Sequence, residues 1–165
     1  MLTVIGIGAN LGDRRAAIEA AIDAIANLPG VDVVARSSLW QTKPVGGPPQ
    51  PDFINAAVAV RARLPLDELM VELLAIEARF GRVRTERNAP RTLDLDILWA
   101  EGIHVEQTGP DVTELVVPHP RLAERPFALI PLLEVAPGAI DPTTGNPYAR
   151  ILAELGTEGV VPLDS

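Results

Sequence analysis

The sequence predicts an α+β fold, in which helices pack on the faces of an antiparallel sheet. Apolar residues alternate with a period of two in segments such as 53–63, and recur at helical spacing in segments such as 65–80. The segments follow the order strand, helix, two strands, helix, strands and helices, which is typical of this class. A chain of 165 residues, 47% of them hydrophobic, is long enough to bury a core, so we expect residues 1–165 to form a single domain.

The first predicted elements occupy residues 2–41. Residues 2–7 are predicted to form a strand, and residues 8–13 a tight turn into a helix with Asp13 as its N-cap. The glycines here complete neither a dinucleotide-binding fingerprint nor a P-loop, so a turn is the better interpretation. Apolar residues recur at helical spacing up to Leu28, and Pro29 and Gly30 end the helix. Residues 31–41 are the second predicted strand.

The middle of the chain combines a loop, a strand and a helix. Residues 42–52 hold too many Pro and Gly residues for regular structure, and long loops of this kind often bind ligands or act as lids. Residues 53–63 form a third predicted strand, with Phe53 and Asn55 on one face. This pair can stack on a flat heterocycle and bind its edge, although a surface Phe beside an Asn near a turn is the alternative. Residues 65–80 form an amphipathic helix that ends at Gly81.

The second half begins with a central strand at 92–99. After a turn, residues 103–106 are predicted to be its hairpin partner, and residues 113–117 a short strand. A rigid Pro-His-Pro-Arg turn follows, then an apolar helix at 127–135 interrupted by Pro131, and a closing helix at 147–155. The complete order predicts a ferredoxin-like core with helices on both faces of the sheet, a three-layer αβα arrangement.

Two acidic residues in the central strand give the strongest indication of chemistry. Apolar residues from Leu93 to Trp99 alternate with a set that includes Asp94 and Asp96, so one face is apolar and the other carries both carboxylates. Their Cα atoms are expected roughly 6.6 Å apart, which lets both carboxylates converge on one or two metal ions. Oxygen ligands of this kind suit Mg²⁺. A solvated face of an antiparallel strand gives the same alternation, so the pattern alone leaves both interpretations open.

An arginine-rich segment precedes this strand. Residues 79–91 contain five of the chain's 14 Lys and Arg residues, all of them Arg. The planar fork of Arg holds phosphate oxygens, and a carboxylate-bound metal can bridge the same phosphates, so the two features together indicate a phosphate site. A net charge of −8 argues against nucleic acid as the partner, which leaves a small polyanion.

Composition also limits where the protein acts. The chain has no Cys, which excludes disulfides and thiolate metal sites. It starts without the basic and apolar segments of a signal peptide, and no segment approaches a membrane span. We therefore expect a soluble, cytoplasmic, monomeric protein without membrane or nucleic-acid partners.

Several motifs resemble those of the 6-hydroxymethyl-7,8-dihydropterin pyrophosphokinases of folate biosynthesis. The most specific are Gly-Arg-Val-Arg at 81–84 and Pro-Arg-Thr-Leu-Asp-Leu-Asp-Ile at 90–97. Further matches at 6–12, 50–56 and 117–121 extend the resemblance over most of the chain. It implies that the hydroxymethyl oxygen of the pterin attacks the β-phosphorus of ATP and that AMP leaves.

The resemblance also implies roles for individual residues. Asp94 and Asp96 bind two Mg²⁺ ions and, with Arg82 and Arg91, form the implied catalytic set. The residues implied to contact ATP are Glu77, Arg82, Arg84, Arg91, His119 and Arg125. The residues implied to hold the pterin are Thr42, Val45, Phe53, Asn55 and Phe127, with the ring between the two phenylalanines. Without the resemblance, Glu77 reads as a solvated helix acid and His119 as structural. The general base stays open.

Three positions differ from the family pattern. Asn88 replaces an aromatic residue that closes over the site, Leu74 replaces a polar residue near adenine, and Ala9 replaces a Ser in the first turn. These differences bear on lid closure and nucleotide affinity. We expect segments 42–52 and 82–90 to be mobile without ligand and to close when MgATP binds.

Two other classes of function remain open from the residues alone. A ligand-binding module without chemistry explains the arginines but not the carboxylates, because acids beside phosphate repel it unless a cation intervenes. A two-carboxylate hydrolase explains the acids but not the arginines. Calorimetric titration of an ATP analogue with and without Mg²⁺ separates the three classes.

Overall fold

The main sheet of this computed structural model, which describes residues 1–9, 13–42, 52–81 and 93–163, is antiparallel. Its strands are β1 (Leu2–Ala9), β2 (Val31–Arg36), β3 (Trp40–Thr42), β4 (Phe53–Ala62), β5 (Asp94–Ala100) and β8 (Val160–Pro162). The order is β5-β1-β4-β3-β8, and β2 also pairs with β4. A second, two-stranded sheet contains β6 (Val105–Gln107) and β7 (Leu115–Val117). The order β5-β1-β4-β2 is that of a ferredoxin-like core.

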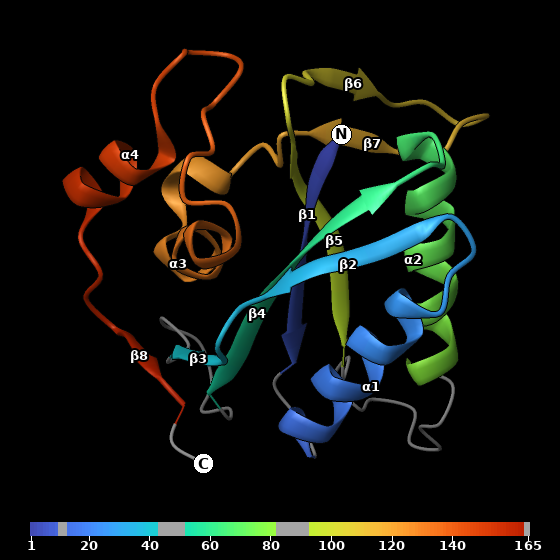
Figure 1. The fold of residues 1–165 in the computed structure, drawn as a ribbon, viewed down its shortest axis with the longest axis horizontal. Helices are drawn as coiled ribbons and strands as arrows, with labels where there is room; N and C mark the ends of the chain where they lie inside the picture. The colour runs from blue at the N-terminus through green and yellow to red at the C-terminus, as the bar shows by residue number, and fades with distance from the viewer. Residues whose placement is uncertain (10–12, 43–51, 82–92, 164–165) are drawn as a thin grey trace.

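Helices cover both faces of the main sheet (Figure 1). They are α1 (Arg14–Ala26), α2 (Leu66–Gly81), α3 (Pro126–Val135) and α4 (Tyr148–Leu155), and a single 3-10 turn, η1 (Leu122–Glu124), precedes α3. One apolar cluster joins α1 and α2 to sheet residues such as Ile5 and Ile97, and a second joins α3 to residues such as Leu98. The predicted three-layer α+β fold is therefore confirmed.

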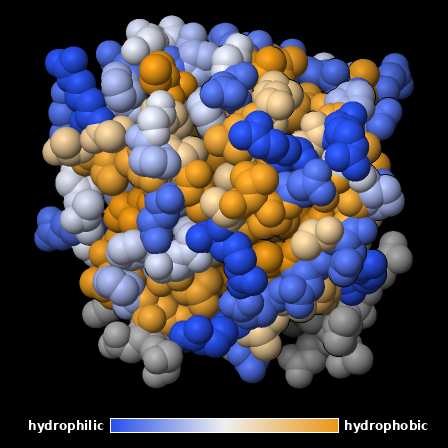
Figure 2. All heavy atoms as spheres, viewed as in Figure 1, coloured by the Kyte–Doolittle hydropathy of each residue, from blue (hydrophilic) through white to orange (hydrophobic). Residues whose placement is uncertain are grey.

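Most large apolar side chains lie within these two clusters. In the view of Figure 2, the apolar surface that remains gathers over the strands between α3 and α2, bordered by polar side chains. In the described parts of the chain, no helix is long and apolar enough to span a membrane.

The first helix begins as predicted. The Oδ1 atom of Asp13 accepts a hydrogen bond from the backbone N–H of Ala16 at 3.0 Å, which satisfies one of the free donors at the helix start. Gly30 has a φ of +80°, a left-handed conformation that favours Gly. Gly8 and Ala9, predicted to begin the turn, instead belong to β1.

The prediction of one strand over 31–41 is wrong, because residues 37–39 separate β2 from β3. The Oγ atom of Ser37 accepts a hydrogen bond from the backbone N–H of Ala57 at 2.8 Å. Ser38 donates from its Oγ atom to Glu134 of α3 at 2.9 Å. Serine side chains thus replace ladder hydrogen bonds here, and the chain shifts along β4 before β3 begins.

The predicted position of Trp99 is also wrong. The β1–β5 register places Val4 opposite Trp99 but Ile5 opposite Ile97, so Leu98 is an extra residue on β5. Both Leu98 and Trp99 therefore lie in the apolar cluster beneath α3 and α4, whereas Ile97 lies in the other cluster.

Two predictions for the second half need correction. β6 pairs with β7 and not with β5, and the N–H of His119 donates to the carbonyl of Leu98 at 2.8 Å on β5. The turn that carries His119 thus occupies the place expected for a hairpin partner. α3 continues through Pro131 without interruption; Pro131 only removes the N–H that the carbonyl of Phe127 would accept in a regular helix.

Candidate active site

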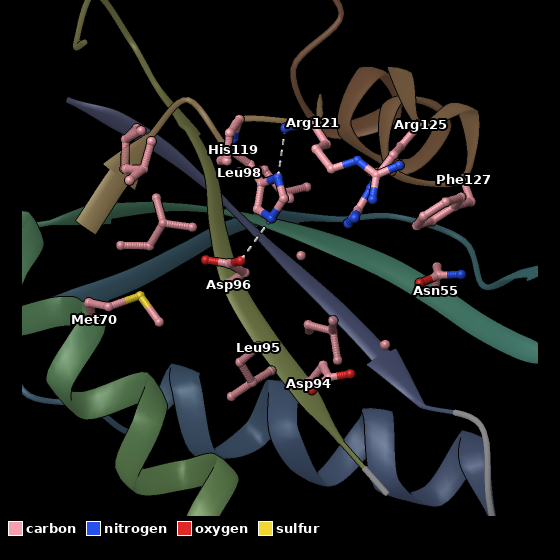
Figure 3. Close-up of a pocket in the computed structure, with 18 of the residues that line it drawn as sticks. Asn55, Met70, Asp94, Leu95, Asp96, Leu98, His119, Arg121, Arg125 and Phe127 are labelled. Carbon is pink, nitrogen blue, oxygen red and sulfur yellow. Dashed lines mark hydrogen bonds and ion pairs between the residues drawn. The ribbon is translucent and has the colours of Figure 1, made fainter. Parts of the chain in front are cut away.

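A cavity of about 1110 Å³ is lined by residues of the strands β1, β3, β4, β5 and β7, of α2, η1 and α3, and of the turn before η1 (Figure 3). Nine predicted site residues line it: Thr42, Phe53, Asn55, Glu77, Asp94, Asp96, His119, Arg125 and Phe127. The described members of the predicted pterin and nucleotide sets therefore share one cavity. Their individual roles stay predictions.

The other predicted site residues lie outside the described part of the chain. These are Val45, Arg82, Arg84 and Arg91. Asn88 and most of the two segments expected to close over the ligands lie outside it as well.

Two glycines lie beside the carboxylate pair. In the β1–β5 ladder, Gly8 is opposite Asp94 and Gly6 is opposite Asp96. Directly opposed residues present their side chains on the same face of a sheet, so neither carboxylate has a side chain next to it on β1. All four residues line the cavity. The space that a Cβ atom would need is taken at Gly6 by the side chain of Leu98, at 2.9 Å, and at Gly8 by the Oδ1 atom of Asn55, at 3.2 Å.

The side chain of His119 contacts one of these carboxylates, that of Asp96. Its Nε2 atom is 3.2 Å from the Oδ2 atom of Asp96, and its Nδ1 atom accepts a hydrogen bond from the backbone N–H of Arg121 at 3.2 Å (Figure 3). Because Nδ1 accepts a hydrogen bond, the proton of a neutral imidazole is on Nε2, the nitrogen that faces the Asp96 carboxylate. The backbone bond to Leu98 fixes this turn to β5.

A cationic group lies at the α3 side of the cavity. The guanidinium carbon of Arg125 is 5.6 Å from the ring centroid of Phe127, within the range of a cation–π interaction. Burial and the neighbouring Arg121 lower the pKa of Arg125, while Asp96 and Glu124 oppose this shift. The guanidinium nevertheless stays charged at neutral pH. A ligand here meets a positive charge and an aromatic face together.

Two polar side chains near Phe53 have unsatisfied atoms. Thr42 is opposite Phe53 in the β3–β4 ladder. The Oγ1 atom of Thr42 and the Nδ2 atom of Asn55 are buried without a hydrogen-bond partner among the described residues. Both residues line the cavity. Buried polar atoms of this kind are costly unless a ligand or water binds them, so this end of the cavity suits a ligand with polar ring edges.

The sequence matches the family model described as 7,8-dihydro-6-hydroxymethylpterin-pyrophosphokinase over residues 4–137. The chain belongs to this family. A Synechocystis sp. protein named 2-amino-4-hydroxy-6-hydroxymethyldihydropteridine pyrophosphokinase is 39% identical over 160 residues, which cover 97% of this chain and 79% of that protein. Proteins of the same name from Methylorubrum extorquens and Pseudomonas aeruginosa are each 40% identical over 156 residues, with 94% of this chain and 94% and 93% of those proteins covered.

Solved structures show the same fold. The crystal structure of wild-type Plasmodium falciparum HPPK-DHPS matches 98% of this chain with a TM-score of 0.75 and 13% sequence identity. At this identity the likeness concerns the fold alone. This chain covers 48% of that longer chain.

Glu77, which the resemblance to this pyrophosphokinase family assigns to the ATP site, contacts β5, the strand predicted to be central, which lies at the end of the strand order in the main sheet. Its Oε2 atom accepts a hydrogen bond from the backbone N–H of Leu95 at 2.7 Å. Leu95 lies between the two aspartates in the sequence. Glu77 therefore both lines the cavity and binds the backbone of the strand segment that carries the proposed metal ligands.

The donor set suits the Mg²⁺ that the pyrophosphokinase resemblance implies. Among the described residues, no three His, Asp or Glu side chains converge as a complete metal site. Mg²⁺ is commonly held by one or two carboxylates and completes its shell with water and substrate phosphates. Asp94 and Asp96, which both line the cavity, fit this pattern.

Sequence reasoning missed some residues of this cavity. Arg121 lines it, as do Gly6 and Gly8. Arg121 belongs to the same Pro-His-Pro-Arg motif as His119, and this motif was the available signal. The glycines fall in the 6–12 segment that matches the family, but this match assigned them no role, because their place in the site depends on the pairing of β1 with β5.

Proposed function

We propose that this cavity binds ATP and 6-hydroxymethyl-7,8-dihydropterin together and that residues 1–165 act as a single catalytic domain. The chain's family gives the reaction, which is transfer of pyrophosphate to the hydroxymethyl group of the pterin, in folate biosynthesis. The observation that supports the proposal most directly is that one cavity is lined by a pair of carboxylates, a cationic group and buried polar atoms without hydrogen-bond partners among the described residues.

In this proposal, Asp94 and Asp96 hold two Mg²⁺ ions. When bound, Mg²⁺ neutralises phosphate charge and orients the phosphate oxygens for in-line displacement. The carboxylates start from β5 on the same face, so the strand sets their separation. Both aspartates line the cavity, so phosphate oxygens bound there can approach them.

The nucleotide phosphates are assigned to the cationic residues. Arg125 and His119 line the cavity, and His119 presents its Nε2–H toward Asp96. When the Asp96 carboxylate binds Mg²⁺ instead, the same Nε2–H can donate a hydrogen bond to a phosphate oxygen. The resemblance adds Arg82, Arg84 and Arg91 to this set, with Arg82 and Arg91 in the catalytic group.

The pterin is assigned to the end of the cavity near Phe53. Phe53 and Phe127 hold the ring between them, since both line the cavity and come from β4 and α3. The Nδ2 atom of Asn55 and the Oγ1 atom of Thr42 supply polar contacts to the ring edge, with Val45 added by the resemblance. These contacts place the hydroxymethyl oxygen toward the phosphates and so reduce the entropy lost in reaching the transition state.

AMP formation tests this function directly. The protein is incubated with ATP and 6-hydroxymethyl-7,8-dihydropterin, with Mg²⁺ or with EDTA, and AMP and the pterin diphosphate are separated chromatographically. We expect equal amounts of both products, dependent on Mg²⁺ and on the pterin. ADP or orthophosphate as the nucleotide-derived product, or ATP binding without turnover, contradicts the proposal.

We also propose that the protein acts as a cytoplasmic monomer whose partners are its two small substrates. The expectation follows from the composition and from the nature of ATP as co-substrate. Light scattering on the purified chain tests the monomer, and a dimer mass contradicts it.

A further inference from the structure

The strand that carries both aspartates lies at an edge of the main sheet. β5 pairs with β1 on one side, and on the other side no strand formed by the described residues of the chain pairs with it in this sheet. Its first residue is Asp94, so the carboxylate pair stands at the beginning of an edge strand. Edge strands expose unpaired backbone groups, and the ends of strands open most readily. Both carboxylates therefore depend on whatever holds this end of β5.

Glu77 contacts the strand at the residue between the two acids. Its carboxylate accepts the N–H of Leu95 at 2.7 Å, a length typical of a bond to an ionised acceptor. A single bond at this position constrains the peptide units that lead to Asp94 and to Asp96. Glu77 thus accepts the Leu95 N–H, which does not bond to β1, the strand next to β5.

The helix that carries Glu77 is itself firmly placed. On α2, Leu73 and Ile76 are buried in the same apolar cluster as Leu95. The position of the carboxylate is therefore set by packing within one turn of Glu77. At the other end of this edge, the N–H of His119 holds the carbonyl of Leu98 at 2.8 Å. The stretch with the aspartates lies between these two anchors.

We propose that Glu77 is a positioning residue that fixes the separation of Asp94 and Asp96 through the backbone of Leu95. This inference rests on the proposed function for its effect on turnover. It adds that Glu77 acts on the metal site through β5, whatever contact it also makes with the nucleotide. The property that matters is then an oxygen acceptor at this position, more than its negative charge.

Three variants separate these roles. Glu77→Ala removes the acceptor, whereas Glu77→Gln keeps an oxygen at the same reach and removes the charge. Glu72→Ala is the matched control, because Glu72 is an exposed acid on the same helix. Melting temperatures show whether each variant keeps its fold.

The first measurement needs no ligand. Hydrogen exchange of the Leu95 amide, followed by NMR in the free protein, should accelerate in Glu77→Ala and stay slow in Glu77→Gln and Glu72→Ala. Unchanged protection of this amide in Glu77→Ala overturns the proposal. Because the readout involves no substrate, it stands even if the wild-type protein forms no AMP, a result that contradicts the proposed function instead.

The second measurement concerns the metal. In Glu77→Ala, the Mg²⁺ concentration for half-maximal AMP formation should rise by about tenfold or more, the usual effect of losing a group that orients a metal ligand. Affinity for a pterin analogue should stay unchanged. Glu77→Gln should recover most of the loss. If Glu77→Gln is as impaired as Glu77→Ala, the charge of Glu77 is what matters and the positioning role is wrong.

Discussion

Gly8 lies directly opposite Asn55 in the β1–β4 ladder, and the Oδ1 atom of Asn55 is 3.2 Å from the place that a Cβ atom would occupy at residue 8. The amide side chain therefore uses space that only a Gly leaves open. Asp94 is opposite Gly8 on the other side of β1. One glycine thus separates the proposed pterin-binding amide from a proposed metal-binding carboxylate.

Gly8→Ala should weaken pterin binding. An added methyl group at this distance forces Asn55 to move by a few tenths of an ångström, which misaligns its hydrogen bonds. We expect pterin affinity to fall by up to about tenfold, the value of one hydrogen bond, with a smaller effect on an ATP analogue. Calorimetric titration of each ligand checks this. Gly138→Ala is the control, since a Cβ atom there meets nothing within 4 Å. Unchanged pterin affinity in Gly8→Ala would mean that Asn55 does not read the ring.

Asp94→Ala and Asp96→Ala should each reduce turnover by more than about 10²-fold, as expected for an electrostatic group at a reacting centre. The fold should persist, because Asp94 is exposed and the side chain of Asp96 is 48% exposed. Rates of AMP formation and melting curves measure the two effects. Glu106→Ala, which removes an exposed acid from β6, should change neither. AMP formation near the wild-type rate in either aspartate variant would sink the metal-binding assignment.

Local sequence patterns were sufficient for most of the fold and for the acidic pair. The period-two pattern around Asp94 and Asp96 fixes which face the carboxylates share, and this face lines the cavity. The cap at Asp13 likewise depends on residues close in sequence. Such features survive in the folded chain because tertiary packing does not oppose them.

Features that depend on distant partners were not predictable. The extra residue at Leu98 follows from pairing with β1, and it moves Trp99 to the other apolar cluster. The break at Ser37 depends on the N–H of Ala57, twenty residues away. β8 was missed because its three residues carry too little pattern, and it forms only where β3 offers an edge. The close approach of the Leu98 side chain to Gly6 likewise depends on strand pairing.

Phe53→Ala and Phe127→Ala should weaken pterin binding more than ATP binding. Stacking acts on the flat ring, and each aromatic contact contributes on the order of 1 kcal/mol beyond burial. Separate titrations of a pterin analogue and an ATP analogue measure the difference. Phe80, the one other phenylalanine of the chain, is the control. It packs against the apolar core beneath α2, so Phe80→Ala should lower stability and should not weaken the binding of one ligand more than that of the other. Equal losses of both ligands in the Phe53 and Phe127 variants would assign these rings to the core.

Tyr148→Phe should preserve or raise stability at neutral pH and remove a loss of stability at high pH. The hydroxyl of Tyr148 is buried without a hydrogen-bond partner among the described residues, so its removal should leave the free energy of unfolding unchanged or raise it by about 1 kcal/mol.

The pH dependence follows from the pKa of this phenol. Burial and then the charge of Asp141 raise the pKa of Tyr148 in the folded chain, whereas the unfolded chain ionises near pH 10. Because only the unfolded state loses the proton just above this pH, wild-type stability should fall there, and Tyr148→Phe should not share that part of the fall. Urea unfolding at pH about 8 and about 10.5 measures it. Tyr148 is the chain's one Tyr, so tyrosinate absorbance reports it directly. Ionisation near pH 10 while the chain is still folded would show that water or a partner reaches the hydroxyl, contrary to this prediction.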